Sequence, residues 1–187
     1  MAKIQKSASE AKKVIEKIES EGHFMIVGPR KGKVIVEAVK KKKPHRILEI
    51  GTYVGYSAVL MADAMHGKVK IISLEADPSN ARVASENVNK AGFENIIEVK
   101  VGDAKKLIPK LIGTFDLMFI DAAKEEYLEY LLKAEDKLKK GAVIVADNVK
   151  IFEENMRDYL KYVRESGKYK SITFDVGSDA LEVSIKR

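Results

Sequence analysis

From residue 46 onward, short apolar runs alternate with longer stretches in which apolar residues recur at helical spacing. The apolar runs span residues 46–50, 70–75, 96–101, 115–120 and 142–146. The helical stretches lie near residues 55–65, 78–91, 103–111 and 124–139. Nearly continuous apolar runs are typical of strands that are buried on both faces, as in parallel sheets covered by helices. The alternation therefore predicts an α/β fold with a doubly wound, Rossmann-like sheet.

The segment before residue 46 predicts two additional helices. Residues 3–21 favour an amphipathic helix, because apolar residues recur at spacings of three and four to form one stripe: Ile4, Ala8, Ala11, Ile15 and Ile18. A second helix is expected over residues 31–42. The stripe of the first helix must be buried somewhere, either on the sheet of this chain or on a second subunit of a homodimer.

The C-terminal segment follows another pattern. After a helix near 153–166, the apolar runs 170–176 and 180–186 are separated only by a short turn, residues 177–179. A link this short joins antiparallel strands, because a parallel crossover needs a dozen or more residues. The sequence therefore predicts a final β-hairpin at one edge of the sheet.

The length of the chain predicts its domain organisation. The chain has 187 residues, which favours a single domain over residues 1–187: an N-terminal helical segment (1–45), a core (46–150) and a C-terminal helix with hairpin (151–187).

Composition excludes several classes of protein. The absence of cysteine excludes disulfides, thiolate nucleophiles and cysteine-ligated metal centres. No apolar run is long enough to span a membrane, and the lysine-rich start lacks a signal-peptide pattern. We expect a cytoplasmic protein without membrane contacts.

The net charge of +6 is unevenly distributed. Residues 1–46 carry 13 lysines and arginines against 5 acidic residues, whereas the rest of the chain carries 21 against 23. A basic surplus can attract nucleic acid or anionic ligands. The lysine run 40–43, however, precedes the first strand, at the edge opposite to the one where such sheets bind ligands. Near the expected ligand site the basic residues are Arg30, Lys31 and Lys33.

Polar residues cluster where the predicted strands end. Ligands of open α/β sheets bind at the carboxyl ends of the strands, so these positions are the candidate site. They are Glu49 to Ser57 with two glycines, Glu75, Asp103, Asp121 with Lys124, and Asp147 with Asn148. Asp77 before Pro78, and Asp103, are also expected N-caps of helices. The dinucleotide-binding motif G-x-G-x-x-G would need a glycine two residues after Gly51, but Tyr53 stands there. The sequence therefore disfavours a dinucleotide site and a nicotinamide-dependent dehydrogenase.

The chain resembles the S-adenosylmethionine-dependent O-methyltransferases of the metal-dependent catechol and caffeoyl-CoA type. The segments that carry the resemblance are LEIGTYVGYSA (48–58), SLEAD (73–77), VGDA (101–104), FIDAAKEEY (119–127) and VADNV (145–149). It runs from about residue 22 to the C-terminus. The resemblance implies a seven-stranded sheet whose last strand is antiparallel, in agreement with the predicted hairpin, and often a homodimer.

The resemblance also implies roles for individual residues. It makes Asp121, Asp147 and Asn148 the ligands of Mg²⁺ or another divalent cation, and Lys124 the general base. It assigns the methyl donor to Val27, Glu49, Gly51, Tyr53, Ser57, Glu75, Ala76, Asp103, Ala104 and Asp121. Met25 and Lys31 fall on a segment that in the family covers donor and acceptor. Two carboxylates and an amide oxygen suit a hard cation, which would lower the pKa of an acceptor hydroxyl.

Three functions remain as alternatives. The leading one is methylation of a hydroxyl on a small, aromatic vicinal diol. The second is the same chemistry on a hydroxylated nucleoside in tRNA, which the basic N-terminal region motivates. The third is a module that binds the donor without catalysis, which the complete set of metal-site residues and Lys124 argues against. Catechol-specific members have a tryptophan where His23 stands and a proline-bearing segment where Val149 to Phe152 stand, so the sequence leaves the acceptor open.

Overall fold

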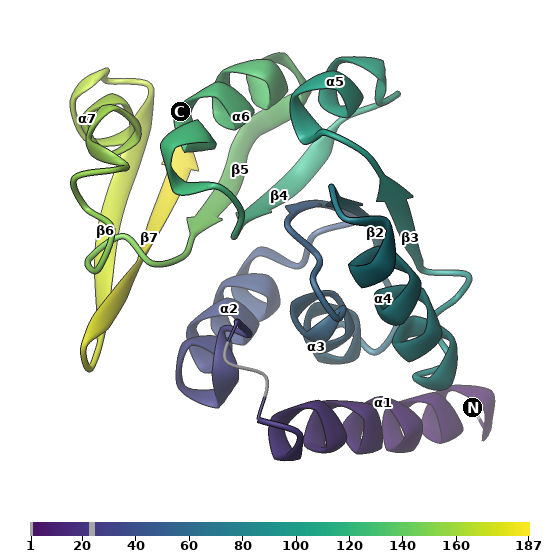
Figure 1. Cartoon of the computed structure of the whole chain (residues 1–187). Helices are drawn as coiled ribbons and strands as arrows, with labels where there is room; N and C mark the ends of the chain where they lie inside the picture. The colour runs from purple at the N-terminus through teal and green to yellow at the C-terminus, as the bar shows by residue number, and fades with distance from the viewer. Residues whose placement is uncertain (1, 23–24) are drawn as a thin grey trace.

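Seven strands form one sheet in the order β3-β2-β1-β4-β5-β7-β6 (Figure 1). The strands are β1 (Arg46–Ile50), β2 (Lys70–Glu75), β3 (Ile97–Val101), β4 (Phe115–Ile120), β5 (Leu138–Ala146), β6 (Tyr169–Val176) and β7 (Asp179–Lys186). β1 to β5 pair in parallel, and β7 runs antiparallel to both of its neighbours. The predicted fold class, with its antiparallel last strand, is confirmed. The computed structural model describes residues 2–22 and 25–187; the side chains of residues 2–8 lie outside it.

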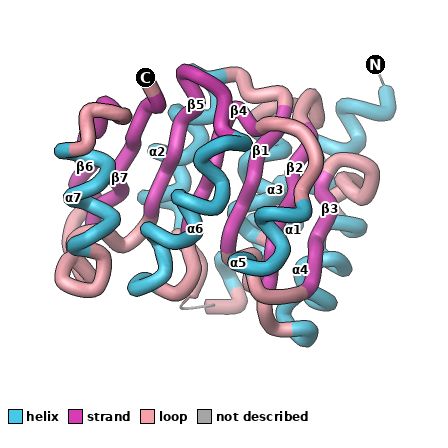
Figure 2. The backbone as a smooth tube through the Cα atoms, turned by 90° about the horizontal axis from the view of Figure 1, so that it is seen from above, coloured by secondary structure: helices cyan, strands magenta, loops and turns pink. Residues whose placement is uncertain are grey.

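Helices cover both faces of the sheet, as Figures 1 and 2 show. The α-helices are α1 (Ala2–Ser20), α2 (Gly28–Lys42), α3 (Tyr56–Ala64), α4 (Pro78–Lys90), α5 (Ala104–Leu107), α6 (Tyr127–Ala134) and α7 (Arg157–Glu165). Short 3-10 turns are η1 (Ile108–Lys110), η2 (Lys124–Glu126) and η3 (Glu135–Lys137). Helices α1 to α4 lie on one side, and α5 to α7 lie on the other. Each side has its own apolar core against the central strands.

Some helix boundaries differ from the sequence prediction. Helix α2 begins at Gly28, three residues earlier than expected, because Pro29 fits the first helical turn. The stretches 103–111 and 124–139 are not continuous helices. The first divides into α5 and η1, and the second into η2, α6 and η3, with its last two residues already in β5, which begins at Leu138. The predicted caps are correct: Asp77 accepts hydrogen bonds from two backbone amides, and Asp103 accepts one from the amide of Lys105.

Helix α1 buries its apolar stripe within this chain. Ala11, Val14 and Ile18 are buried, and α1 contacts α3 and α4 instead of the sheet. Ile4 and Ala8 lie outside the described side chains. The stripe therefore has a partner without a second subunit, and the expected homodimer, like the single domain, stays a prediction. None of the described helices combines the length and apolarity needed to cross a membrane.

The register of the strands decides where the polar residues lie. Ile50 pairs with Ile120, and Ile120 pairs with Ala146, so the residues that follow these strands lie side by side. The lysine run 40–43 lies at the opposite edge, where α2 ends and where Lys42 donates a hydrogen bond to the carbonyl of Gly141, 2.7 Å away. The parallel sheet thus separates the basic run from the candidate site.

Candidate functional site

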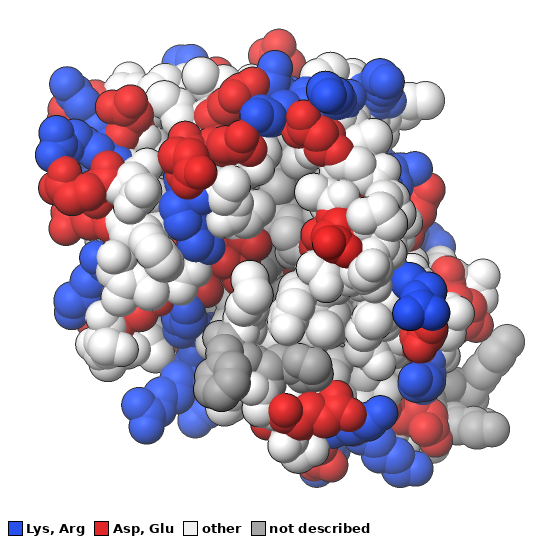
Figure 3. All heavy atoms as spheres, viewed as in Figure 1, with Lys and Arg blue, Asp and Glu red and all other residues white. Residues whose placement is uncertain are grey.

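A cleft of about 1080 Å³ opens at the carboxyl ends of the parallel strands. In the space-filling view the middle of this face is hollowed, with mainly uncharged atoms on its walls (Figure 3). The predicted site residues that line the cleft are Met25, Val27, Lys31, Gly51, Tyr53, Ser57, Glu75, Ala76, Asp103, Ala104, Asp121, Lys124, Asp147 and Asn148. Glu49 is the exception, because it lies fully buried beneath the floor. The fold therefore brings together residues from six separate segments.

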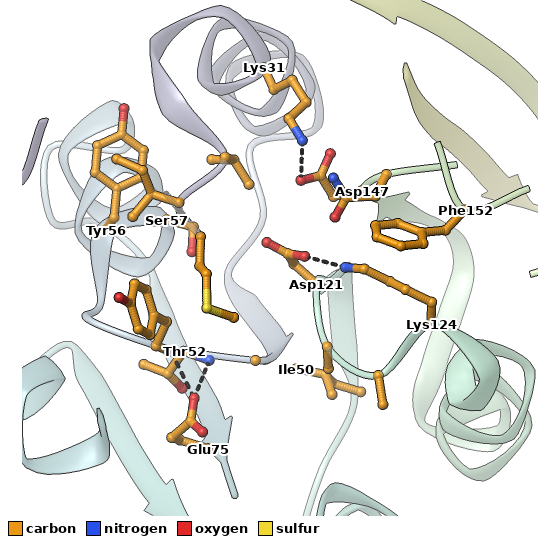
Figure 4. Close-up of a pocket in the computed structure, with 18 of the residues that line it drawn as sticks. Lys31, Ile50, Thr52, Tyr56, Ser57, Glu75, Asp121, Lys124, Asp147 and Phe152 are labelled. Carbon is orange, nitrogen blue, oxygen red and sulfur yellow. Dashed lines mark hydrogen bonds and ion pairs between the residues drawn. The ribbon is translucent and has the colours of Figure 1, made fainter. Parts of the chain in front are cut away.

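The loop after β1 requires glycine where it meets β4. Gly51 has a φ of +88°, and a Cβ atom there would lie 1.9 Å from the carbonyl oxygen of Asp121. The loop is tied to β2 by Glu75, whose Oε2 accepts hydrogen bonds from the backbone amides of Thr52 (3.1 Å) and Tyr53 (2.7 Å) (Figure 4). Glu75 thus shapes the loop in addition to facing the cleft. Its carboxylate retains lone pairs that can accept from ligand hydroxyls.

Glu49 supports the loop from below. Its carboxylate accepts hydrogen bonds from the hydroxyls of Ser57 and Ser73. Burial raises its pKa from 4.5 to about 7, the two serines oppose this shift, and the charges of Asp121 and Glu75 add to it. A buried carboxylate of this kind gives the floor of the cleft a negative potential once it is ionised.

Asp121 and Lys124 form an ion pair at the end of β4. The 3-10 turn η2 begins at Lys124, which brings its ammonium group to 2.7 Å from Asp121 Oδ1 (Figure 4). Lys124 also donates to the hydroxyl of Tyr127 at 3.0 Å, and Tyr127 donates to the backbone carbonyl of Asp147 at 3.3 Å. The side chains of both Lys124 and Asp121 are less than one-fifth exposed. The lysine is therefore held in the cleft wall with its nitrogen directed at the polar cluster.

Asp147, at the end of β5, is engaged by a residue from another segment. Lys31 on α2 lies 2.6 Å from Asp147 Oδ2 and 3.0 Å from Asp179 Oδ2, at the start of β7. Asp179 also accepts a hydrogen bond of 2.8 Å from the side-chain amide of Asn148. Asp179 is not among the site residues predicted from the sequence, where it belongs to the turn 177–179. No local pattern identifies it, because its partners are 31 and 148 residues away.

The donor set can accommodate a divalent cation. Among the described residues, no three side chains of histidine, cysteine, aspartate or glutamate converge as a metal site. The candidate set is instead two carboxylates and one amide, from Asp121, Asp147 and Asn148. Asp147 Oδ1 is buried and has no hydrogen-bond partner among the described residues. Burial and the neighbouring charge of Asp121 raise the pKa of Asp147, against the opposing effect of Lys31. A bound cation would satisfy this oxygen and relieve the repulsion.

Apolar side chains surround the outer part of the cleft. Met25 is 72% exposed, Ile151 53% and Phe152 40%, and all three line the cleft. The ring of Phe152 lies 5.9 Å from the ammonium group of Lys124. Tyr56 also lines the cleft and donates a hydrogen bond to Glu19 of α1. His23 lies outside the described residues. The rim thus offers apolar surface next to a polar interior.

Comparison with known proteins decides the family. A family model described as O-methyltransferase matches residues 2–177. The chain belongs to the O-methyltransferase family. The expectation of an S-adenosylmethionine-dependent O-methyltransferase is confirmed at this level.

Relatives of this O-methyltransferase include enzymes named for catechol. It is 35% identical over 167 residues to catechol O-methyltransferase of Sus scrofa, covering 86% of this chain and 87% of the pig protein. It is 38% identical over 137 residues to catechol O-methyltransferase of Niastella koreensis, covering 69% of this chain and 62% of that protein. The solved structure of a candidate O-methyltransferase from Klebsiella pneumoniae superposes with a TM-score of 0.85 at 26% identity, covering 93% of this chain and 90% of that one.

Proposed function

We propose that this O-methyltransferase moves the methyl group of S-adenosylmethionine to a hydroxyl of a small aromatic vicinal diol, with a divalent cation and with Lys124 as the base. The observation that carries the proposal is the convergence of Asp121, Lys124, Asp147 and Asn148 in one cleft. A module that only bound the donor would need Asp121, but it would not need Lys124, Asp147 and Asn148 beside it. Their arrangement therefore supports catalysis over simple binding.

The donor fits the part of the cleft between β1, β2 and β3. The carboxylate of Glu75 would accept hydrogen bonds from the ribose hydroxyls. Gly51 allows the loop backbone to approach the methionine moiety, next to Tyr53 and Ser57. Asp103 and Ala104 line the end that would take the adenine, together with Ala76. Val27, which is buried at the start of α2, would close this part of the cleft from above.

The cation and the acceptor fit the part of the cleft next to β4 and β5. Asp121, Asp147 and Asn148 would hold the cation, and their hard oxygen atoms suit Mg²⁺. When bound, the cation would act as a Lewis acid that lowers the pKa of the acceptor hydroxyl. The exposed side chains of Met25 and Phe152 offer apolar contacts for an aromatic ring.

Lys124 would take the proton from the acceptor hydroxyl. In its neutral form the amine accepts this proton while the acceptor oxygen attacks the donor methyl group, and the sulfonium leaves as a neutral thioether. The bonds to Asp121 and Tyr127 hold the nitrogen in place. Most of the rate acceleration would come from aligning oxygen, methyl carbon and sulfur in one line.

The placement of charge favours a small acceptor over RNA. The lysine run 40–43 lies at the edge of the sheet opposite the cleft. Lys31, one of the three basic residues expected near the site, is engaged with two carboxylates and only 14% exposed. The other basic residues that line the cleft are Arg30, Lys105 and Lys124, so a tRNA substrate would find few cationic contacts there. Binding of tRNA that falls steeply with salt would support the RNA alternative instead.

The test uses purified protein, labelled S-adenosylmethionine, Mg²⁺ and a panel of catechols, with products identified by mass spectrometry. We expect methylation that EDTA abolishes and that excess Mg²⁺ restores. The Asp147→Asn variant should lose activity, because it weakens the cation site. The matched control is Asp175→Asn, since Asp175 is an exposed carboxylate paired with Lys150. Full activity of Asp147→Asn in the presence of EDTA would contradict the metal-dependent mechanism.

A further inference from the structure

Lys31 occupies an unusual place for a cleft lysine. Its side chain is 14% exposed, and its ammonium group contacts two carboxylates from different strands, Asp147 at 2.6 Å and Asp179 at 3.0 Å. Figure 4 shows the side chain reaching from α2 down to Asp147, beside Asp121. The positive charge therefore lies next to the oxygen atoms that we assign to the cation. Because like charges repel, the ammonium group in this position must affect how tightly the divalent cation binds.

Asp179 contacts both this lysine and Asn148, which is another of the assigned ligands. One of its carboxylate oxygens, Oδ2, accepts from both Lys31 and the side-chain amide of Asn148. The bond from Nδ2 of Asn148 fixes which end of that amide faces Asp179 and leaves its oxygen available for the cleft. The backbone of Asn148 is held in the left-handed region, with a φ of 63°. Asp179 therefore has contacts with both the lysine and a ligand, without being placed as a ligand itself.

We propose that Lys31 is an internal competitor for the divalent cation and that Asp179 is the carboxylate that receives it when the cation binds. The inference rests on the proposed metal dependence. In the absence of the cation, Lys31 neutralises Asp147. When the cation binds, the ammonium group keeps its contact with Asp179 and gives up the one with Asp147. Both residues are positioning residues, because they act through Asp147 and Asn148.

The charges of the cluster explain why both residues are needed. Asp121, Asp147 and Asp179 contribute three carboxylates, and Lys31 and Lys124 contribute two ammonium groups. Without Lys31, the carboxylates would repel one another more strongly in the metal-free protein. Without Asp179, Lys31 would have Asp147 as its one carboxylate partner in this cluster and would release it less readily. Lys31 thus stabilises the metal-free site, and Asp179 allows the site to keep its affinity for the cation.

The test is direct titration of Mn²⁺ into the full chain, without donor or acceptor, following free Mn²⁺ by electron paramagnetic resonance. For Lys31→Met we expect binding about tenfold tighter, because the competing charge is gone. For Asp179→Asn we expect binding about tenfold weaker, because Lys31 then stays on Asp147. The double variant should bind at least as tightly as the wild type, since the competitor that causes the loss is absent.

Controls separate this role from a structural one. Lys33→Met removes the same charge from the same helix at an exposed position outside the cleft and should leave Mn²⁺ affinity unchanged. Lys31→Arg keeps the charge and should not show the tighter binding. Weaker or unchanged binding in Lys31→Met, or a double variant as weak as Asp179→Asn, would overturn the inference alone. A wild type that binds no Mn²⁺ would overturn both the inference and the metal-dependent function.

Discussion

The ammonium group of Lys124 lies 2.7 Å from the carboxylate of Asp121, across the short loop that joins β4 to η2. This contact joins the proposed base to a proposed metal ligand on one short segment. It requires that β4 ends at Ile120 and that a 3-10 turn, in place of a regular α-helix, begins at Lys124.

Replacing Lys124 tests its role as the base. Lys124→Met should lower the rate of methyl transfer by about 10²-fold or more, because no amine remains to take the proton. Lys124→Arg keeps the positive charge beside Asp121 but should be as impaired, since a guanidinium does not lose its proton in proteins. Single-turnover assays with labelled donor measure both rates. Lys106→Met, at an exposed position, is the control; an active arginine variant would assign Lys124 a purely electrostatic role.

The buried carboxyl group of Glu49 should make stability depend on pH. Its pKa is raised from 4.5 to about 7 by burial, so ionisation favours the unfolded chain. Below pH 4.5 the group is protonated in both states and the free energy of unfolding is at its full value. As pH rises from 4.5 toward 7, the free energy of unfolding falls by about 3 kcal/mol. Glu49→Gln cannot ionise, so its stability relative to the wild type should increase between pH 4.5 and pH 8. Urea unfolding without donor measures this; exposed Glu86→Gln should show no such trend.

Gly51 should be irreplaceable for a steric reason. Gly51→Ala would place a Cβ atom 1.9 Å from the carbonyl oxygen of Asp121 in a left-handed conformation. We expect it to lower the free energy of unfolding by about 2 kcal/mol or more and to weaken donor binding. Gly167→Ala is the matched control, because Gly167 has a φ of +76° with nothing within 4 Å of the added atom. It should cost only about 1 kcal/mol, and equal losses would contradict the predicted clash.

Glu75 should matter for the donor more than for the fold. Glu75→Gln keeps one oxygen that can accept from the amides of Thr52 and Tyr53, but it loses the bond that Oε1 accepts from the amide of Asp77 (2.9 Å). It also loses the charge that would strengthen bonds from the ribose hydroxyls. We expect S-adenosylhomocysteine to bind about tenfold more weakly by calorimetry, and the melting temperature to fall only by the few degrees that one lost backbone hydrogen bond costs. The exposed Glu98→Gln variant serves for comparison. Unchanged affinity would remove Glu75 from the donor site.

Much of the fold could be predicted from the sequence, because strands and caps depend on local patterns. The apolar runs 46–50, 70–75 and 115–120 match β1, β2 and β4 to the residue. Residues that end parallel strands meet at one edge whatever the details of packing, so the cleft could be located before the structure was known. Helix interiors were less predictable, since the 3-10 turns near Ile108 and Lys124 depend on how the chain packs against the sheet.

The sequence by itself determined the order of the elements, the family and the residues at the strand ends. Only the tertiary structure decided which of these residues contact one another. Lys31 and Asp179 are 148 residues apart, and they meet because β7 inserts between β5 and β6 while α2 packs against these three strands. Periodicity reports contacts within a few residues, whereas an ion pair of this kind depends on the packing of three distant segments. For that reason the role of Asp179 in the site could not be predicted from the sequence.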